Sequence, residues 1–347
     1  MSLGPLMISL EGTTLSEGDR RWLNSPVVGG VILFSRNFTD LEQLRSLVAE
    51  IHALRTPELL VTVDHEGGRV QRFRTPFTEL PAMRTLGHSY DIDPRAALKT
   101  AVEFGWLMAA ELIAVGIDLS FAPVVDRDLG LAEVIGDRAL HEDAEVVAAL
   151  ASAFIDGLQS AGMVGTAKHF PTHAGAHADS HTDLAVDRRD YSELYDDLLP
   201  YRRLIAGGLH SIMVGHVAFP KLDELPASLS RWWIETQLRK ELGFAGAVIS
   251  DDMNMAGAAA YGSPAERVRR ALDAGCDMVL LCNCPALVDE VIDSLSGYSD
   301  PAAQLRLMRL RSRPGPGIEE LCDSERWQRA AAAIAGLDMP PPLELEG

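Results

Sequence analysis

The sequence is short of basic residues. It has 31 Lys and Arg residues against 50 Asp and Glu residues, which gives a formal net charge of −19. A protein that binds nucleic acid through its phosphates needs a basic face, and anionic membranes attract basic segments. We therefore expect neither nucleic acid nor a membrane surface as a partner.

Long hydrophobic runs are also missing from the sequence. The most apolar segments, 27–34 and 278–282, are far shorter than the roughly 20 residues that a membrane-spanning helix needs. No Lys or Arg precedes the first apolar run, and acidic Glu11 follows that run, so a secretion signal is not indicated. These features predict a cytoplasmic protein.

Cysteine is scarce and confined to the last quarter of the chain, at Cys276, Cys282, Cys284 and Cys322. Four clustered cysteines are too few for a disulfide framework in a chain of 347 residues. The apolar fraction of 47% is that of an ordinary folded globule. The length would allow two domains, but α/β barrels of this size commonly form one.

What the sequence does contain is a series of short, nearly continuous apolar runs, as expected of parallel strands buried on both faces. These runs are 6–10, 29–34, 59–64, 119–126, 163–170, 211–216, 245–251 and 278–283. Amphipathic, helix-length segments separate many of them: 41–54, 143–158, 193–205, 231–242, 265–274 and 286–295. Asp40, Ser230 and Ser263 are suitable N-cap residues for three of these helices.

Eight β/α units in series predict an α/β fold, a TIM (β/α)8 barrel, with residues 1–347 as a single domain. We expect residues 300–347 to be a C-terminal helical extension packed on the barrel, interrupted by the Pro and Gly residues of 314–317. The alternative is a doubly wound open sheet. No GxGxxG motif follows the first strand, and no P-loop sequence occurs.

Charged and polar residues stand at the ends of five of the predicted strands. They are Asp64, Asp126, Lys168 with His169, His216, and Asp251 with Asp252. The carboxyl ends of barrel strands share one rim, and barrel active sites lie on that rim. Long segments without regular structure, 66–86, 127–140 and 171–190, follow strands three, four and five. We therefore expect an active site at this rim.

Histidines recur at intervals of four between residues 169 and 181, at His169, His173, His177 and His181. On a helix this spacing would form a metal-binding stripe, but Pro171 and Gly175 oppose a helix, so we expect no metal. A polar surface loop is the alternative, and it suits His177. Asp179 stands two residues before His181, where a carboxylate can orient one ring nitrogen and leave the other for proton transfer.

Five motifs occur in order along the chain. They are Asp64-x-Glu66-Gly67-Gly68-Arg69-Val70-Gln71-Arg72, Gly136-Asp137-Arg138, Lys168-His169-Phe170-Pro171-x-His173, Asp179-Ser180-His181 and Ser250-Asp251-x-x-x-Met255. Together they resemble one known family, the bacterial β-N-acetylglucosaminidases of glycoside hydrolase family 3 that recycle cell-wall fragments. They occur in the family's order and spacing, and the resemblance covers about residues 4 to 300.

The resemblance implies roles for individual residues. Asp251 would be the nucleophile that forms a covalent glycosyl-enzyme, and His181 the general acid/base, oriented by Asp179. The residues that would bind N-acetylglucosamine are Asp64, Arg72, Arg138, Lys168 and His169. Asp252 is the rival nucleophile, because alternation along a strand would point one of the two carboxylates at the site and the other away from it.

The resemblance also implies a substrate and no cofactor. We expect a monomer that removes non-reducing terminal N-acetylglucosamine with retention from peptidoglycan fragments that contain 1,6-anhydro-N-acetylmuramic acid and its peptides. One alternative is another family 3 specificity, such as a β-glucosidase or a glycoside phosphorylase. A non-catalytic sugar-binding barrel is the other, although the presence of Asp251, Asp179 and His181 speaks against it.

The sequence departs from the family in one functional loop. The family usually has glycines where this chain has Thr172 and Ala174. If those positions required a positive φ, the loop would be strained or would follow another path. The placement of His181 depends on that path.

Overall fold

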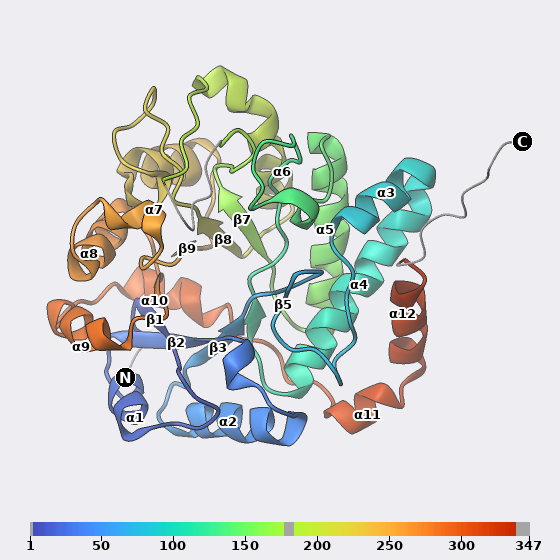
Figure 1. Ribbon diagram of the computed structural model, residues 1–347, viewed down its shortest axis with the longest axis horizontal. Helices are drawn as coiled ribbons and strands as arrows, with labels where there is room; N and C mark the ends of the chain where they lie inside the picture. Colours follow the sequence, from blue (N-terminus) through green and yellow to red (C-terminus); the bar gives the residue numbers. More distant parts are fainter. Residues whose placement is uncertain (1–2, 177–183, 338–347) are drawn as a thin grey trace, which may run out of the picture.

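The computed structural model describes residues 3–176 and 184–337 of the chain, and it has an α/β fold built on parallel strands (Figure 1). The parallel strands are β1 (Leu6–Ser9), β2 (Val28–Leu33), β3 (Leu60–Val63), β6 (Leu119–Ser120), β7 (Thr166–Phe170), β8 (Ser211–Val214), β9 (Ala247–Ser250) and β10 (Val279–Leu281). Each overlaps one of the eight predicted runs, so all eight predictions are confirmed.

The parallel strands form two sheets, one in the order β10-β1-β2-β3-β6 and the other in the order β7-β8-β9. Two isolated parallel bridges connect them. Val124, beyond β6, pairs with Lys168 of β7, and Ile249 of β9 pairs with Met278, directly before β10. The parallel α/β architecture is therefore confirmed.

Both faces of the strands are buried, and alternate residues belong to different apolar clusters. Ile8, Val31 and Val61 lie in the large cluster that also includes helix residues. Met7 and Ile32 lie in a second cluster, which is completed by residues of the tail. This arrangement explains why the strands are continuously apolar rather than alternating.

The six predicted helical segments all correspond to observed helices. These are α2 (Leu41–Ala53), α5 (Ala144–Ala161), α6 (Tyr195–Ala206), a π-helical segment, Trp232–Glu241, α8 (Pro264–Ala274) and α9 (Pro285–Ser294). Four further helices were not predicted: α1 (Glu17–Leu23), α3 (Arg84–Ile92), α4 (Pro94–Ala114) and α7 (Ala256–Ala259). The three predicted caps are confirmed: Asp40 accepts from Gln43 N, Ser263 from Glu266 N and Ser230 from Trp233 N.

Helix α4 was not among the predicted helices, although it spans 21 residues. It packs against α3, α5 and α12, so apolar residues cover most of its surface and the amphipathic pattern is weak. Gly105 lets α5 approach closely, since a Cβ there would lie 2.1 Å from the carbonyl oxygen of Phe154. By length and composition alone α5 could cross a membrane, but half of that segment is buried inside the fold.

The tail forms α10 (Pro301–Met308), α11 (Ile318–Cys322) and α12 (Glu325–Ala335), with the predicted break before α11. The part of the predicted helical extension that follows this break therefore consists of two helices, α11 and α12. Arg306 of α10 forms an ion pair with buried Asp277 at 2.6 Å. Trp327 of α12 donates a hydrogen bond to Glu111 of α4, and α12 runs beside α4 in Figure 1.

Candidate active site

Six of the eight residues that the sequence assigned to the site line one pocket of about 490 Å³. Asp64 follows β3, Arg72 follows the hairpin of β4 (His65–Gly67) and β5 (Val70–Gln71), Arg138 ends a 3-10 turn, Lys168 and His169 belong to β7, and Asp251 follows β9. The remaining two, Asp179 and His181, lie outside the described residues.

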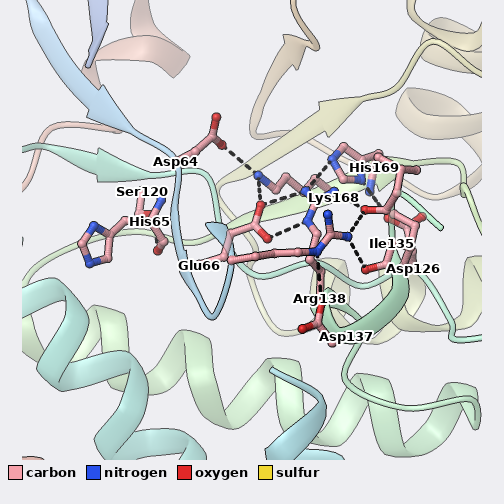
Figure 2. Close-up of polar contacts among 12 residues, drawn as sticks. Asp64, His65, Glu66, Ser120, Asp126, Ile135, Asp137, Arg138, Lys168 and His169 are labelled. Atoms are coloured by element: carbon pink, nitrogen blue, oxygen red, sulfur yellow. Dashed lines mark hydrogen bonds and ion pairs between the residues drawn. The ribbon is translucent and has the colours of Figure 1, made fainter. Parts of the chain in front are cut away.

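Two anions and two cations form a cluster in the lining of this pocket, and Figure 2 shows the contacts among them. Lys168 Nζ lies 2.9 Å from Asp64 Oδ1 and 2.6 Å from Glu66 Oε1. Arg138 donates to both carboxylate oxygens of Glu66, from Nε at 2.9 Å and from Nη2 at 2.8 Å. The cluster presents fixed donors and acceptors that can hydrogen-bond hydroxyl groups of a bound molecule.

The members of this cluster hold one another in their charged forms. Burial raises the pKa of Glu66, but the charges of Arg138 and Lys168 outweigh it and lower that pKa below its ordinary value. Burial lowers the pKa of Lys168, and the carboxylates of Asp64 and Glu66 raise it above its ordinary value. Glu66 and Lys168 therefore stay charged at neutral pH although both are almost fully buried.

Asp126 fixes His169 at the edge of the cluster. Its Oδ2 lies 2.8 Å from His169 Nδ1, and its Oδ1 accepts from the backbone N–H of His173 at 2.7 Å. Burial raises the pKa of Asp126, but hydrogen bonding from His169 outweighs it, and the net shift is downward. The carboxylate can only accept, so Nδ1 carries the proton and Nε2 faces Arg138 Nη2 at 3.5 Å.

Sequence reasoning missed two members of this arrangement, Glu66 and Asp126. Glu66 lies in the same motif as Asp64, two positions later, which places both side chains on one side of an extended chain. Asp126 was identified as a strand end but was given no role. Their burial and partners, which mark them as central, appear only in the folded chain.

The two carboxylates that follow β9 both line the pocket. β9 ends at Ser250, so the alternation of a strand, on which the prediction that only one of them faces the site was based, does not extend to these two residues. Asp251 Oδ1 accepts from the backbone N–H of Asp252 at 2.9 Å. Asp252 Oδ1 accepts from the N–H groups of Asn254 and Cys282, each at 2.9 Å.

The pKa values of these neighbours move in opposite directions. Burial raises the pKa of Asp251, but the electrostatic interaction with His169, together with the hydrogen bond from the backbone N–H of Asp252, outweighs burial and brings that pKa to about 2. Burial raises the pKa of Asp252 to about 7, and the charge of Asp251 contributes to the rise. Asp251 is therefore the carboxylate that is ionised throughout the neutral range, while Asp252 anchors backbone groups.

The loop after β7 is not strained at the two positions where glycines were expected. Asn283 is the non-glycine residue with a positive φ in the described parts of the chain, so neither Thr172 nor Ala174 adopts the backbone conformation that favours glycine. Thr172 Oγ1 donates to Asp197 at 3.0 Å and accepts from the N–H of Ala174 at 2.9 Å. The threonine thus stabilises the turn with its own hydroxyl.

Residues 171–176 form turns rather than a helix, as Pro171 and Gly175 predicted. His173 lines the pocket, and burial, followed by the charge of His169, lowers its pKa to about 4. Within 3–176 and 184–337, no group of three or more His, Cys, Asp or Glu side chains is arranged to hold a metal ion. His177 and His181 lie outside these ranges.

A pocket at the carboxyl ends of parallel strands, with an ionised carboxylate and a polar, ion-paired wall, is typical of the active sites of α/β enzymes. Residues 6–310 match the model of the glycosyl hydrolase family 3 N-terminal domain. The chain belongs to this family and is a glycoside hydrolase.

Close relatives share the whole length of the chain. The beta-hexosaminidase of Thioalkalivibrio sulfidiphilus is 53% identical over 346 residues and covers 100% of both chains. That of Nitrosospira multiformis is 50% identical over 339 residues, 97% of each. NagZ from Neisseria gonorrhoeae, solved with N-trifluoroacetyl-D-glucosamine, is 43% identical and has a TM-score of 0.93 over 98% of this chain and 99% of its own. The same protein has been solved with a zinc ion, at 42% identity and a TM-score of 0.92 over the same shares.

Proposed function

We propose that the protein is a retaining exo-β-N-acetylglucosaminidase. Its substrates are peptidoglycan fragments with a non-reducing terminal N-acetylglucosamine, including those that end in 1,6-anhydro-N-acetylmuramic acid and its peptides. The names of the relatives and the N-acylated glucosamine bound to NagZ support this sugar class. The enzyme acts in the cytoplasm as a monomer, with roles in peptidoglycan recycling, and needs no cofactor.

In the first half-reaction Asp251 attacks the anomeric carbon while His181 donates a proton to the departing glycosidic oxygen. In the second, His181 takes a proton from water, and the water displaces Asp251 from the sugar. Two inversions at one carbon give net retention. Asp179 orients the imidazole of His181. The observation that carries this proposal is the ionised carboxylate of Asp251 in the wall of the pocket.

The sugar hydroxyls are bound by Asp64, Arg72, Arg138, Lys168 and His169. Lys168 and Arg138 supply donors whose positions are fixed by Glu66. Arg72 lies 3.9 Å from Asp64, with its guanidinium 5.5 Å from the ring centre of Phe34. Because these groups are already ordered, little side-chain entropy is lost when the sugar binds.

We also propose that the eight parallel strands form a closed (β/α)8 barrel, in one domain that spans residues 1–347 with a packed extension at 300–347. The bridges of Val124 with Lys168 and of Ile249 with Met278 join the two sheets at both of their edges and support this closure.

The test compares the hydrolysis of a chromogenic β-N-acetylglucosaminide with that of the matching β-glucoside, with and without phosphate. Cleavage of the first substrate in buffer without phosphate, with a β-configured sugar as the first product by NMR, supports the proposal. Preference for the glucoside identifies another specificity, and a sugar 1-phosphate product identifies a phosphorylase. Binding without cleavage of either substrate identifies a sugar-binding protein.

A further inference from the structure

The turn that carries Asp251 is anchored to its neighbours through nearly every backbone group. Asp251 N–H donates to the carbonyl of Val214 at 2.9 Å, which attaches the turn to β8. Met253 N–H donates to the carbonyl of Leu280 at 2.9 Å, which attaches it to β10. The carbonyl of Asp252 accepts from Met255 N–H at 3.0 Å within the turn.

That same carbonyl has a second donor, the buried side chain of His216. His216 comes two residues after β8 ends, and its Nε2 lies 2.9 Å from the carbonyl oxygen of Asp252. Its Nδ1 lies 2.7 Å from Ser228 Oγ. A carbonyl oxygen only accepts, so Nε2 must carry the proton; in a neutral ring Nδ1 then accepts from the serine hydroxyl.

The environment keeps this imidazole neutral and fixed. Burial lowers the pKa of His216 below its ordinary value, although the charge of Asp251 partly opposes this. Both His216 and Ser228 are fully buried, and Ser228 N–H donates to the carbonyl of Gly215 at 3.2 Å. The pair therefore joins β8 and the short 3-10 turn Ala227–Leu229 to the turn that carries Asp251.

We propose that His216 and Ser228 are positioning residues that hold the backbone of Asp251 and Asp252 in the geometry for nucleophilic attack. The inference rests on the proposed role of Asp251. An apolar side chain of similar size would fill the same space, but it would leave the Asp252 carbonyl without this donor. Small displacements of a reacting group are costly, since about 1 Å can reduce the rate by about 10²-fold.

The experiment measures how fast a 2-fluoro sugar with a good leaving group inactivates four variants. The rate constant of inactivation and the affinity for the inhibitor are determined separately. His216→Leu removes both ring contacts. His216→Gln can place an amide N–H near the position of Nε2, whereas His216→Asn reaches only the position of Nδ1. Ser228→Ala removes the hydroxyl that donates to Nδ1, and it remains informative if a His216 variant fails to fold.

Two controls match these variants in type and strand. His210 lies at the opposite end of β8, and its Nδ1 has no hydrogen-bond partner among the described residues, so His210→Leu tests the loss of a histidine beside the same strand. Ser211 begins β8, and its buried Oγ has no hydrogen-bond partner within residues 3–176 and 184–337, so Ser211→Ala tests the loss of a buried serine hydroxyl. Both should keep the rate constant of the unsubstituted protein.

We expect His216→Leu and His216→Asn to lower the rate constant by about 10- to 100-fold with unchanged affinity. His216→Gln should recover most of that loss, and Ser228→Ala should lose about fivefold, as for one neutral hydrogen bond. Two results would overturn this inference but leave the proposed function standing. One is a loss in the His216→Gln variant, or in the His210 control, equal to that in the His216→Leu variant. The other is an unchanged rate constant in both the His216→Leu and the Ser228→Ala variants. Labelling of the unsubstituted protein at a residue other than Asp251 would overturn the proposed function, and this inference with it.

Discussion

Glu66 and Arg138 form a bidentate ion pair in the wall of the pocket, with contacts of 2.9 Å from Nε and 2.8 Å from Nη2. Both side chains are almost completely removed from solvent, with exposures of 1% and 10%. The pair fixes the orientation of the guanidinium, and Lys168 at 2.6 Å completes the neutralisation of the carboxylate. Because the charges are buried, loss of one partner leaves the others uncompensated.

We predict that Glu66→Gln lowers the free energy of unfolding by about 3–5 kcal/mol at pH 7, as for other broken buried ion pairs. The folded-state pKa of Glu66 is lowered, so its stabilisation is present above the ordinary carboxyl pKa and is lost as the pH falls below about 4.5. Urea unfolding at pH 7 and pH 4 measures both effects. The difference between Glu66→Gln and the unsubstituted protein should shrink at the lower pH.

Glu111→Gln is the matched control for a buried glutamate. Its carboxylate accepts from Thr78 and Trp327, and burial raises its pKa, opposite to the shift of Glu66. Glu111→Gln keeps the ion pair of Glu66, so this variant should still lose the stability that Glu66 provides as the pH falls. If Glu66→Gln showed a pH dependence identical to that of the unsubstituted protein, the ion pair would not be a source of stability.

Asp251→Asn should reduce turnover by about 10⁴-fold or more while leaving the fold intact, because an amide cannot attack the anomeric carbon. Circular dichroism and a thermal melt check the fold, and steady-state kinetics check the rate. Asp252→Asn keeps an oxygen that can accept from Cys282 N–H, and it should still be labelled at Asp251 by a 2-fluoro sugar. An adduct on Asp252 in the unsubstituted protein, found by peptide mapping, would reverse the assignment.

His181→Ala should slow turnover in a manner that depends on the leaving group. Substrates with a basic departing oxygen need the proton, so a natural disaccharide should lose about 10²–10⁴-fold and a nitrophenyl glycoside much less. Azide should accelerate the release of accumulated glycosyl-enzyme, and Asp179→Ala should show the same behaviour to an equal or smaller degree. Equal slowing of all substrates without azide rescue would make His181 structural, with His173 the next proton donor to test.

Exhaustive chelation should leave activity unchanged. Transfer through a glycosyl-aspartate needs no metal. Assays before and after dialysis against EDTA measure the effect, and the addition of zinc to the dialysed protein distinguishes a requirement from inhibition. Loss of activity that zinc restores would establish a metal-dependent site, with the histidines of segment 169–181 as the first residues to examine.

Much of the fold could be predicted because it depends on local patterns. The eight apolar runs coincide with β1, β2, β3, β6, β7, β8, β9 and β10, since strands buried on both faces must be apolar along their whole length. Asp40 and Ser263 mark helix starts through hydrogen bonds that span only three residues. Helix α4 was missed because its burial by other helices removes the amphipathic pattern.

The candidate site, like the fold, could be predicted only in part. The sequence by itself determined that Asp64, Lys168, His169 and Asp251 stand at strand ends, and these side chains meet in the pocket because the carboxyl ends of parallel strands share one edge. Only the tertiary structure decided how those side chains act on one another. Glu66 meets Arg138 across 72 positions, and burial with neighbouring charges separates the pKa of Asp251 from that of Asp252. Electrostatic energy depends on distance and on exclusion of water, and the chain acquires both only when it folds.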